Sequence, residues 1–222
     1  MDCHGFTSNS IMFYPNLRKS SYSLEEYNKT KKIYHEEVKP QLTLILENIS
    51  ISLNSMLPDL DFNVSEDLGS PFPNANVGKY AWGAITRKGK NKHTDLQFYV
   101  ALRFDYLRFG IYVKQDKQGQ RTFNEIYQSI SKNPDEFLRL LSELKESNIL
   151  LTRRINNQDS GEPKPLDLNE KYGPAWTIEN NTRFNVMSAI KVEDTLNQDV
   201  STRIIECFEK IIPLYKFVLG IK

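Results

Sequence analysis

The sequence predicts an α+β fold, with a central, mostly antiparallel sheet and helices packed on one of its faces. Apolar residues recur with helical spacing in residues 24–57 and again in 200–219, whereas between residues 96 and 113 they occupy every second position. Helices that precede and follow a block of strands, instead of alternating with single strands, are typical of this fold class. With 222 residues and 39% hydrophobic content, the chain is long enough for one well-packed domain.

The N-terminal part of this domain is predicted to be helical. Residues 1–23 have no periodicity, so we expect an N-terminal arm that is extended or loosely packed. Ser23 and Glu26 form the pattern of a capping box, which predicts the start of a helix and of the domain proper, 24–222. The helical region covers residues 24–57, and Pro40 is expected to kink or restart its helix.

Residues 62–114 form the predicted strand block. Alternate side chains of a strand point to opposite faces of the sheet, so two strands in 96–113 each have an apolar face and a face rich in Tyr and Arg. This division is typical of an antiparallel meander with one face in the core. The residues expected in the core are Leu96, Phe98, Val100, Leu102, Leu107, Phe109, Ile111 and Val113.

The C-terminal half begins with a helical insertion at residues 122–147, where helical spacing returns. Residues 156–173 contain little apolar content and are predicted to be a loop. The closing strands and helix occupy 175–220, with the strands near 175–179 and 183–191. The final helix has a broad apolar face.

Composition excludes several classes of protein. No apolar run approaches the ~18 residues of a membrane helix, and the N-terminus lacks the pattern of a signal peptide, so we expect a soluble, cytoplasmic protein. The chain has two cysteines and three histidines, none with metal-ligand spacing. We therefore expect neither a metal site nor a disulfide.

Catalytic signatures are also missing. The run Gly83–Asn91 looks like a phosphate-binding P-loop, but its spacing is one residue too long, and a strand follows where a helix must begin. No nucleophile elbow or zinc-protease motif is present. We expect no cofactor and no enzymatic activity in this domain.

Positive charge is concentrated in one part of the chain. The net charge of the chain is +1, whereas residues 71–125 hold ten Lys and Arg against four Asp and Glu, a net charge of +6. Local charge of this kind is typical of a surface that binds a polyanion, although a solvated hairpin tip would look the same. The residues expected to contact phosphate are Arg87, Lys88, Lys90, Lys92, His93 and Arg103.

Aromatic residues accompany these charges. Trp, Tyr and Arg side chains stack on unpaired bases, so aromatic residues on neighbouring strands are candidates for a base pocket. The candidates are Tyr80, Trp82, Tyr99, Tyr106 and Arg108. An alternative is that Trp82 and several tyrosines belong to the core.

Two other functions remain open. The domain could bind a protein partner through its basic loop. It could also be a noncanonical metal-dependent nuclease that uses Asp61, Glu66 or Asp95.

Three runs of the strand block resemble a known family. They are Asn76–Ile85, Leu96–Leu102 and Phe104–Ile111, and together they are similar to the N-terminal DNA-binding domain of McrB-type proteins. These proteins are the GTP-driven specificity subunits of modification-dependent, type IV-like restriction systems, which act in antiviral defence. The similarity continues weakly through the last strand and the closing helix.

The resemblance implies recognition of a modified cytosine by base flipping into an aromatic pocket. It assigns Trp82 as a stacking wall and places Tyr99 roughly at the position where the family has an apolar pocket residue. It also implies that an AAA+ GTPase motor and a nuclease subunit act with the domain as partners. The chain departs from the family pattern at Ala81, where proline is usual, and in its helical regions 24–57 and 122–147.

Overall fold

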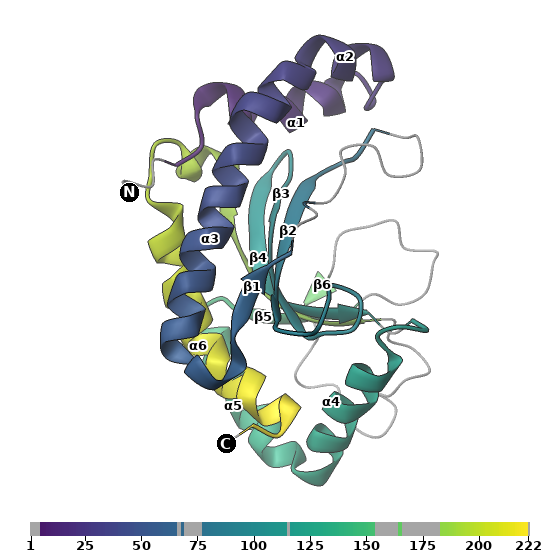
Figure 1. The fold of residues 1–222 in the computed structure, drawn as a ribbon, viewed down its shortest axis with the longest axis vertical. Helices are drawn as coiled ribbons and strands as arrows, with labels where there is room; N and C mark the ends of the chain where they lie inside the picture. Colours follow the sequence, from purple (N-terminus) through teal and green to yellow (C-terminus); the bar gives the residue numbers. More distant parts are fainter. Residues whose placement is uncertain are drawn as a thin grey trace. The chain divides into compact units, whose positions relative to one another are not determined.

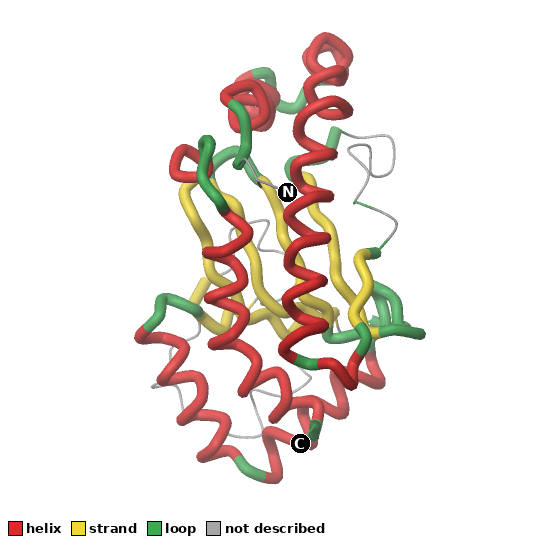
Figure 2. Tube along the Cα trace, turned by 60° about the vertical axis from the view of Figure 1, so that its left-hand side comes forward, coloured by secondary structure: helices red, strands yellow, loops and turns green. Residues whose placement is uncertain are grey.

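The computed structural model describes residues 5–65, 68, 77–114, 116–153, 164–165 and 183–221. Helices and strands occupy separate stretches of the chain, so the predicted α+β class is confirmed (Figures 1 and 2). The chain divides into two compact units. The first unit contains residues 1–88, 99–109 and 189–205, and the second unit contains residues 89–98, 110–188 and 206–222.

In the part of the chain that the structure describes, seven strands are hydrogen-bonded in the order β1-β2-β3-β4-β7-β5-β6. Strand β1 pairs antiparallel with β2, and β5 pairs antiparallel with both β6 and β7. The strands are β1 (Phe62–Val64), β2 (Ala81–Arg87), β3 (Gln97–Leu102), β4 (Tyr106–Lys114), β5 (Leu150–Arg153), β6 (Lys164–Pro165) and β7 (Arg183–Lys191).

The expectation of an extended N-terminal arm is wrong, because residues Ser8–Lys19 form helix α1. The Thr7 side chain caps this helix by accepting a hydrogen bond from the Ser10 backbone N–H at 3.2 Å. Three apolar residues of α1 are buried: Phe13, Tyr14 and Leu17. Pro15 lies inside the helix and interrupts the sequence pattern, which is why periodicity does not reveal it.

The segment before α1 is also fixed in the first unit. Phe6 pairs with Leu196 in an isolated parallel bridge and is fully buried. Its backbone N–H donates to the Thr195 oxygen at 3.2 Å, and its oxygen accepts from Asn197 at 3.1 Å. These contacts join the N-terminal segment to the short helix Val192–Thr195.

The predicted helical region 24–57 is confirmed. It consists of α2 (Leu24–Ile33), a π-helical turn (Tyr34–Val38) and α3 (Lys39–Met56). Ser23 caps α2 as expected, since its side chain accepts from the Glu26 N–H at 3.2 Å. Pro40 lies directly after the π-helical turn, at the start of α3.

Helix α3 packs on β1 and β2 in the first unit. The Asn54 side chain of α3 donates to the Phe62 oxygen at 2.8 Å and accepts from the Phe62 N–H at 2.6 Å. A Cβ atom on Gly83 of β2 would lie 2.2 Å from the Leu46 side chain of α3. Gly83 therefore faces α3 and lets the helix approach the strand closely.

The second unit contains α4 (Gln120–Lys132) and α5 (Pro134–Glu146), and α6 (Val200–Leu219) contributes to both units. The predicted helical insertion and final helix are thus confirmed. Phe98 of β3 lies 4.9 Å from Phe208 and 4.7 Å from Tyr215 of α6, measured between ring centroids. The predicted strand 183–191 is β7.

The eight predicted core residues between Leu96 and Val113 are at most 1% exposed, as expected. The predicted loop 156–173 lies outside the described residues except for 164–165, and the predicted strand 175–179 lies outside them entirely. No described helix is long and apolar enough to cross a membrane.

Candidate nucleic-acid interface

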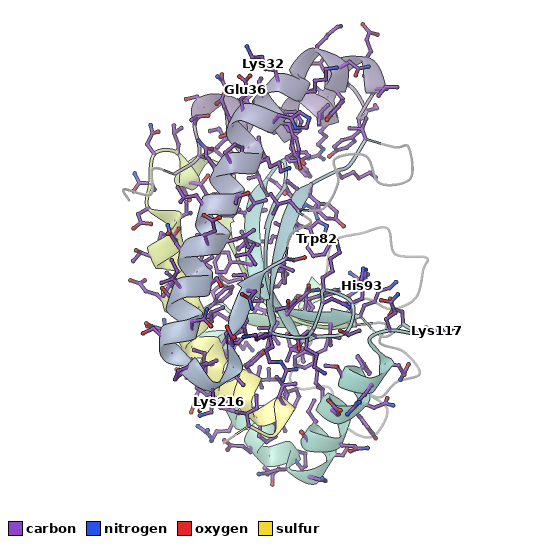
Figure 3. All side chains as sticks on the ribbon, viewed as in Figure 1. Lys32, Glu36, Trp82, His93, Lys117 and Lys216 are labelled. Atoms are coloured by element: carbon purple, nitrogen blue, oxygen red, sulfur yellow. The ribbon has the colours of Figure 1, made fainter. Side chains whose placement is uncertain are left out.

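Trp82 lies on the face of the sheet opposite α3 in the first unit. Its neighbour Gly83 faces α3, and side chains alternate along a strand, so Trp82 points the other way. Figure 3 shows Trp82 on the side of β2 away from α3. The Trp82 side chain is partly exposed. Trp82 is therefore outside the core that α3 forms with β1 and β2.

Strands β3 and β4 add to this second face. A hydrogen bond of 3.0 Å from the Arg103 N–H to the Tyr106 oxygen closes the hairpin between them. Leu107 and Phe109 are at most 1% exposed and mark the core face of β4, so Tyr106 and Arg108 lie on the other face. Tyr106 and Arg108 thus point away from Leu107 and Phe109, as Trp82 points away from α3.

We call the five predicted pocket residues the aromatic face: Tyr80, Trp82, Tyr99, Tyr106 and Arg108. Tyr80 precedes β2 and is 46% exposed. Trp82, Tyr99 and Tyr106 are partly exposed, whereas Arg108 is only 9% exposed. The structure thus brings all five predicted pocket residues into the first unit, and Arg108 is the most buried of them.

Cations and aromatic rings also meet at the α1–α2 turn and the β3–β4 turn of the first unit. The Arg18 guanidinium lies 3.7 Å from the centroid of the Phe104 ring, and Lys79 Nζ lies 5.8 Å from that of Tyr22. Arg103 Nε lies 3.5 Å from Asp105 Oδ1. The predicted phosphate ligand Arg103 is therefore partly neutralised by a carboxylate.

Sequence reasoning misses Arg18 and Lys79 as candidate cations. The sequence pattern places Arg18 in an arm, and only the helical α1 brings it against Phe104. Tyr22 has a positive φ of 57°, an uncommon backbone conformation that turns the chain between α1 and α2. Burial raises the pKa of the Tyr22 hydroxyl, and the nearby Arg18 and Arg103 oppose this shift.

The basic loop between β2 and β3, residues 87–93, has a fixed backbone at its C-terminal end. The Asn91 side chain accepts hydrogen bonds from the N–H groups of His93 at 2.9 Å and Thr94 at 3.2 Å. This Asx-type turn holds the backbone without using the lysines. Gly89 has a φ of 75°, which favours glycine. Lys90 and His93 are exposed, and Lys92 is partly exposed.

The loop is anchored within the second unit by helix α4. The Thr122 hydroxyl donates to the Thr94 oxygen at 2.7 Å. A Cβ atom on Gly119 would lie 3.1 Å from the His93 oxygen, so the N-terminus of α4 is close to the loop backbone. The side chains of Lys90, Lys92 and His93 therefore extend from a supported backbone.

Lys88, like Arg103, is a predicted phosphate ligand that is paired with an acid in the first unit. Its Nζ lies 2.7 Å from Asp61 Oδ2, and its N–H donates to the Asp61 oxygen at 2.8 Å. The hydrogen bond with Asp61 raises the pKa of Lys88. Both side chains are more than half exposed, so the pair contributes little to stability. It does reduce the charge that Lys88 and the partly exposed Arg87 offer to an anion.

The acids considered for a metal-dependent nuclease do not form a site in the described part of the chain. Asp61 is paired with Lys88, and Asp95 is fully buried. Glu66 lies outside the described residues. Among the described residues, no group of three or more His, Cys, Asp or Glu is placed to hold a metal ion.

Comparison with known proteins adds no family to this description. No protein-family model matches the chain, and the search of curated proteins finds no match.

Proposed function

We propose that this chain is a DNA-binding targeting module that recognises a modified base. One observation carries the proposal: the aromatic face of the first unit keeps Tyr80, Trp82, Tyr99 and Tyr106 at least partly exposed. Aromatic side chains confined to a core would be buried, as Phe98 and Phe109 are. Partly exposed aromatic rings on a sheet can stack on bases, each contributing ~1–3 kcal/mol.

The basic loop supports the same function. Lys90, Lys92 and His93 project from a backbone held by Asn91 and Thr122. Little ordering entropy is then lost when the loop meets a phosphate backbone. Phosphate contacts supply affinity that depends on salt but not on sequence, while base contacts supply specificity.

Base flipping is the mechanism that the resemblance to McrB-type domains favours. Extruding a base costs a few kcal/mol of lost stacking and pairing, and this cost is recovered when the base stacks on aromatic side chains. In this proposal Trp82 is the main stacking wall, with Tyr99 and Tyr106 beside it on the aromatic face. Arg108, the fifth predicted pocket residue, is only 9% exposed.

Selection of a modified base requires space for the added group. A methyl-sized difference changes binding by only ~1–3 kcal/mol in an apolar pocket. Modest discrimination is sufficient if binding only triggers a later step. We propose that an AAA+ GTPase motor and a nuclease subunit carry out that step, as in type IV-like restriction systems.

The test is fluorescence anisotropy with matched duplexes that carry cytosine, 5-methylcytosine, 5-hydroxymethylcytosine, glucosylated cytosine or methyladenine. We expect preference for one modified duplex at moderate salt. Equal, salt-sensitive binding to all duplexes would reduce the function to general nucleic-acid binding. No binding at low salt would instead favour a protein partner for the basic loop.

A further inference from the structure

A row of polar side chains crosses the sheet of the second unit. Thr152 of β5 and Asn185 of β7 are opposite each other, and Asn185 Nδ2 donates to Thr152 Oγ1 at 2.8 Å. The Arg183 guanidinium lies 5.7 Å from the centroid of the Tyr112 ring of β4. Because Arg183 and Asn185 are two residues apart in one strand, Tyr112 shares their face of the sheet.

Gln97 of β3 extends this row on the other side of Tyr112. Counting outward from the hairpin hydrogen bond between Arg103 and Tyr106, a regular antiparallel ladder places Gln97 opposite Tyr112. The neighbouring Phe98 points instead to the apolar face, where it contacts Phe208. We call Gln97, Tyr112, Asn185, Thr152 and Arg183 the polar row.

The Gln97 amide is buried without a hydrogen bond. The side chain is 1% exposed, and within the part of the chain that the structure describes neither Nε2 nor Oε1 has a hydrogen-bond partner. Buried amides are nearly always satisfied, because an unpaired one lowers the stability of the fold. Thr152 and Asn185, by contrast, are also buried but satisfy each other.

Gln97 therefore costs stability that a methionine or leucine of similar size would not. Groups of this kind, retained at the expense of stability, are often found at functional sites. Tyr112, which lies beside Gln97, and Arg183 are only partly buried, so the row reaches the surface at these two side chains. A ligand that passes these two side chains would meet an amide with its full hydrogen-bonding capacity.

The chemistry of the row selects a planar ligand with a polar edge. A glutamine amide offers a donor and an acceptor side by side, which matches the edge of a nucleobase such as adenine, with its amine beside a ring nitrogen. Cytosine presents the same arrangement. The Arg183 and Tyr112 planes can stack on the ring of such a ligand.

We propose that the polar row is a nucleobase-binding site in which Gln97 forms a paired hydrogen bond with the base edge. The choice of a base as ligand rests on the proposed DNA-binding function, whereas the site itself rests on the unpaired Gln97 amide. Gln97 is then the residue that determines which base edge is accepted. The aromatic face of the first unit is not part of this assignment.

The test titrates the isolated chain with deoxyadenosine and deoxycytidine while the side-chain amide resonances are followed by NMR. We expect the Gln97 amide signals to shift and saturate. Gln97→Met should weaken binding by about tenfold or more, because both hydrogen bonds to the base are lost. It should also raise the Tm by about 2–4 °C, since an unsatisfied amide is removed.

Gln128→Met is the matched control, because Gln128 is an exposed glutamine of α4 in the same unit. It should change neither nucleoside binding nor the Tm. Unchanged nucleoside binding by Gln97→Met would overturn the proposal. If that variant does not fold, the wild-type titration decides alone: Gln97 amide signals that do not move with either nucleoside exclude the site.

Duplex binding separates this proposal from the proposed function. Nucleoside binding that depends on Gln97, without any duplex binding, would leave the polar row as a nucleobase site and remove the DNA-targeting function. The wild type could instead bind duplexes in a salt-dependent way, with Gln97→Met leaving this binding intact, and bind no nucleoside. That result would support the DNA-targeting function and exclude the polar row as a nucleobase site.

Discussion

The guanidinium of Arg18 lies 3.7 Å from the centre of the Phe104 ring, so α1 is fixed against the turn between β3 and β4 in the first unit. A cation this close to a partly exposed ring contributes ~0.5–1 kcal/mol. Arg18 and Arg103 also both lie near Tyr22. A segment expected to be an arm therefore brings one of its cations to the turn between β3 and β4.

Trp82→Ala is expected to abolish any preference for a modified duplex while weak, salt-dependent DNA binding remains. The stacking wall is removed, but the lysines still meet phosphate. Because Trp82 is partly exposed and faces away from α3, the unfolding free energy should fall by less than the ~3–5 kcal/mol typical of a buried tryptophan. Anisotropy and urea unfolding measure the two effects.

Ile85→Ala is the matched control on the same strand, since Ile85 is fully buried. It should lower the unfolding free energy by ~2–5 kcal/mol and leave the duplex preference intact. A Trp82→Ala variant that is destabilised as much as Ile85→Ala would place Trp82 in the core and remove it from the interface.

The double change Lys90→Ala and Lys92→Ala is expected to weaken binding to all duplexes and to reduce the salt slope by about one for each phosphate that is no longer bound. Lys88 is left out because it is paired with Asp61. The measurement is the dissociation constant as a function of salt concentration. A double variant with Lys132→Ala and Lys145→Ala, two exposed lysines of the second unit, controls for net charge. Equal salt slopes for the two double variants would mean that the basic loop does not contact phosphate.

The sequence predicts the elements whose signal is local. Strands β3 and β4 follow strict alternation, and Ser23 with Glu26 marks the start of α2, so these predictions are correct. Helix α1 escapes prediction because Pro15 breaks its pattern and only three apolar residues face the core. Its helical state depends on contacts with the rest of the first unit, which a local pattern does not contain.

The candidate sites need information that no local pattern holds. The approach of α3 to Gly83 determines on which side of the sheet Trp82 lies. The helix and Gly83 are far apart in the chain. Alternation along β3 correctly places Gln97 on the face opposite Phe98. The burial of Gln97, however, depends on the fold around β3 and β4. The partner of Asn185 comes from β5, which is also distant in sequence.

Gly110→Ala is expected to lower the unfolding free energy by about 3 kcal/mol or more. A Cβ atom at this position of β4 would lie 2.0 Å from the Val186 oxygen and 2.7 Å from the Met187 Cα of β7, and backbone atoms cannot move aside as a flexible side chain can. Urea unfolding measures the decrease.

Gly89→Ala is the control for Gly110, because a Cβ atom there meets nothing within 4 Å and only the positive φ of 75° opposes it. Its cost should be ~1 kcal/mol. If both variants were equally stable, the close approach of β4 to β7 would be contradicted.

The buried Tyr34 should make the stability of the fold decrease at alkaline pH. Burial raises the pKa of its hydroxyl to about 12, above the value of about 10 in an unfolded chain. The folded state therefore favours the protonated form, and its contribution to stability is complete below pH ~10 and is lost as the pH rises from ~10 through ~12. Burial also raises the pKa of Tyr14 well above its ordinary value, which acts in the same direction.

The variant Tyr14→Phe isolates the contribution of the Tyr14 hydroxyl to this pH dependence. The Tyr14 hydroxyl is buried without a hydrogen-bond partner among the described residues, so its removal should leave stability at pH ~8 unchanged or slightly higher. Above pH ~10 the variant should lose less stability than the wild type, because one buried group no longer ionises on unfolding. Urea unfolding between pH ~8 and ~11 measures both values. Equal alkaline losses in the two proteins would mean that the Tyr14 hydroxyl titrates normally in the folded state.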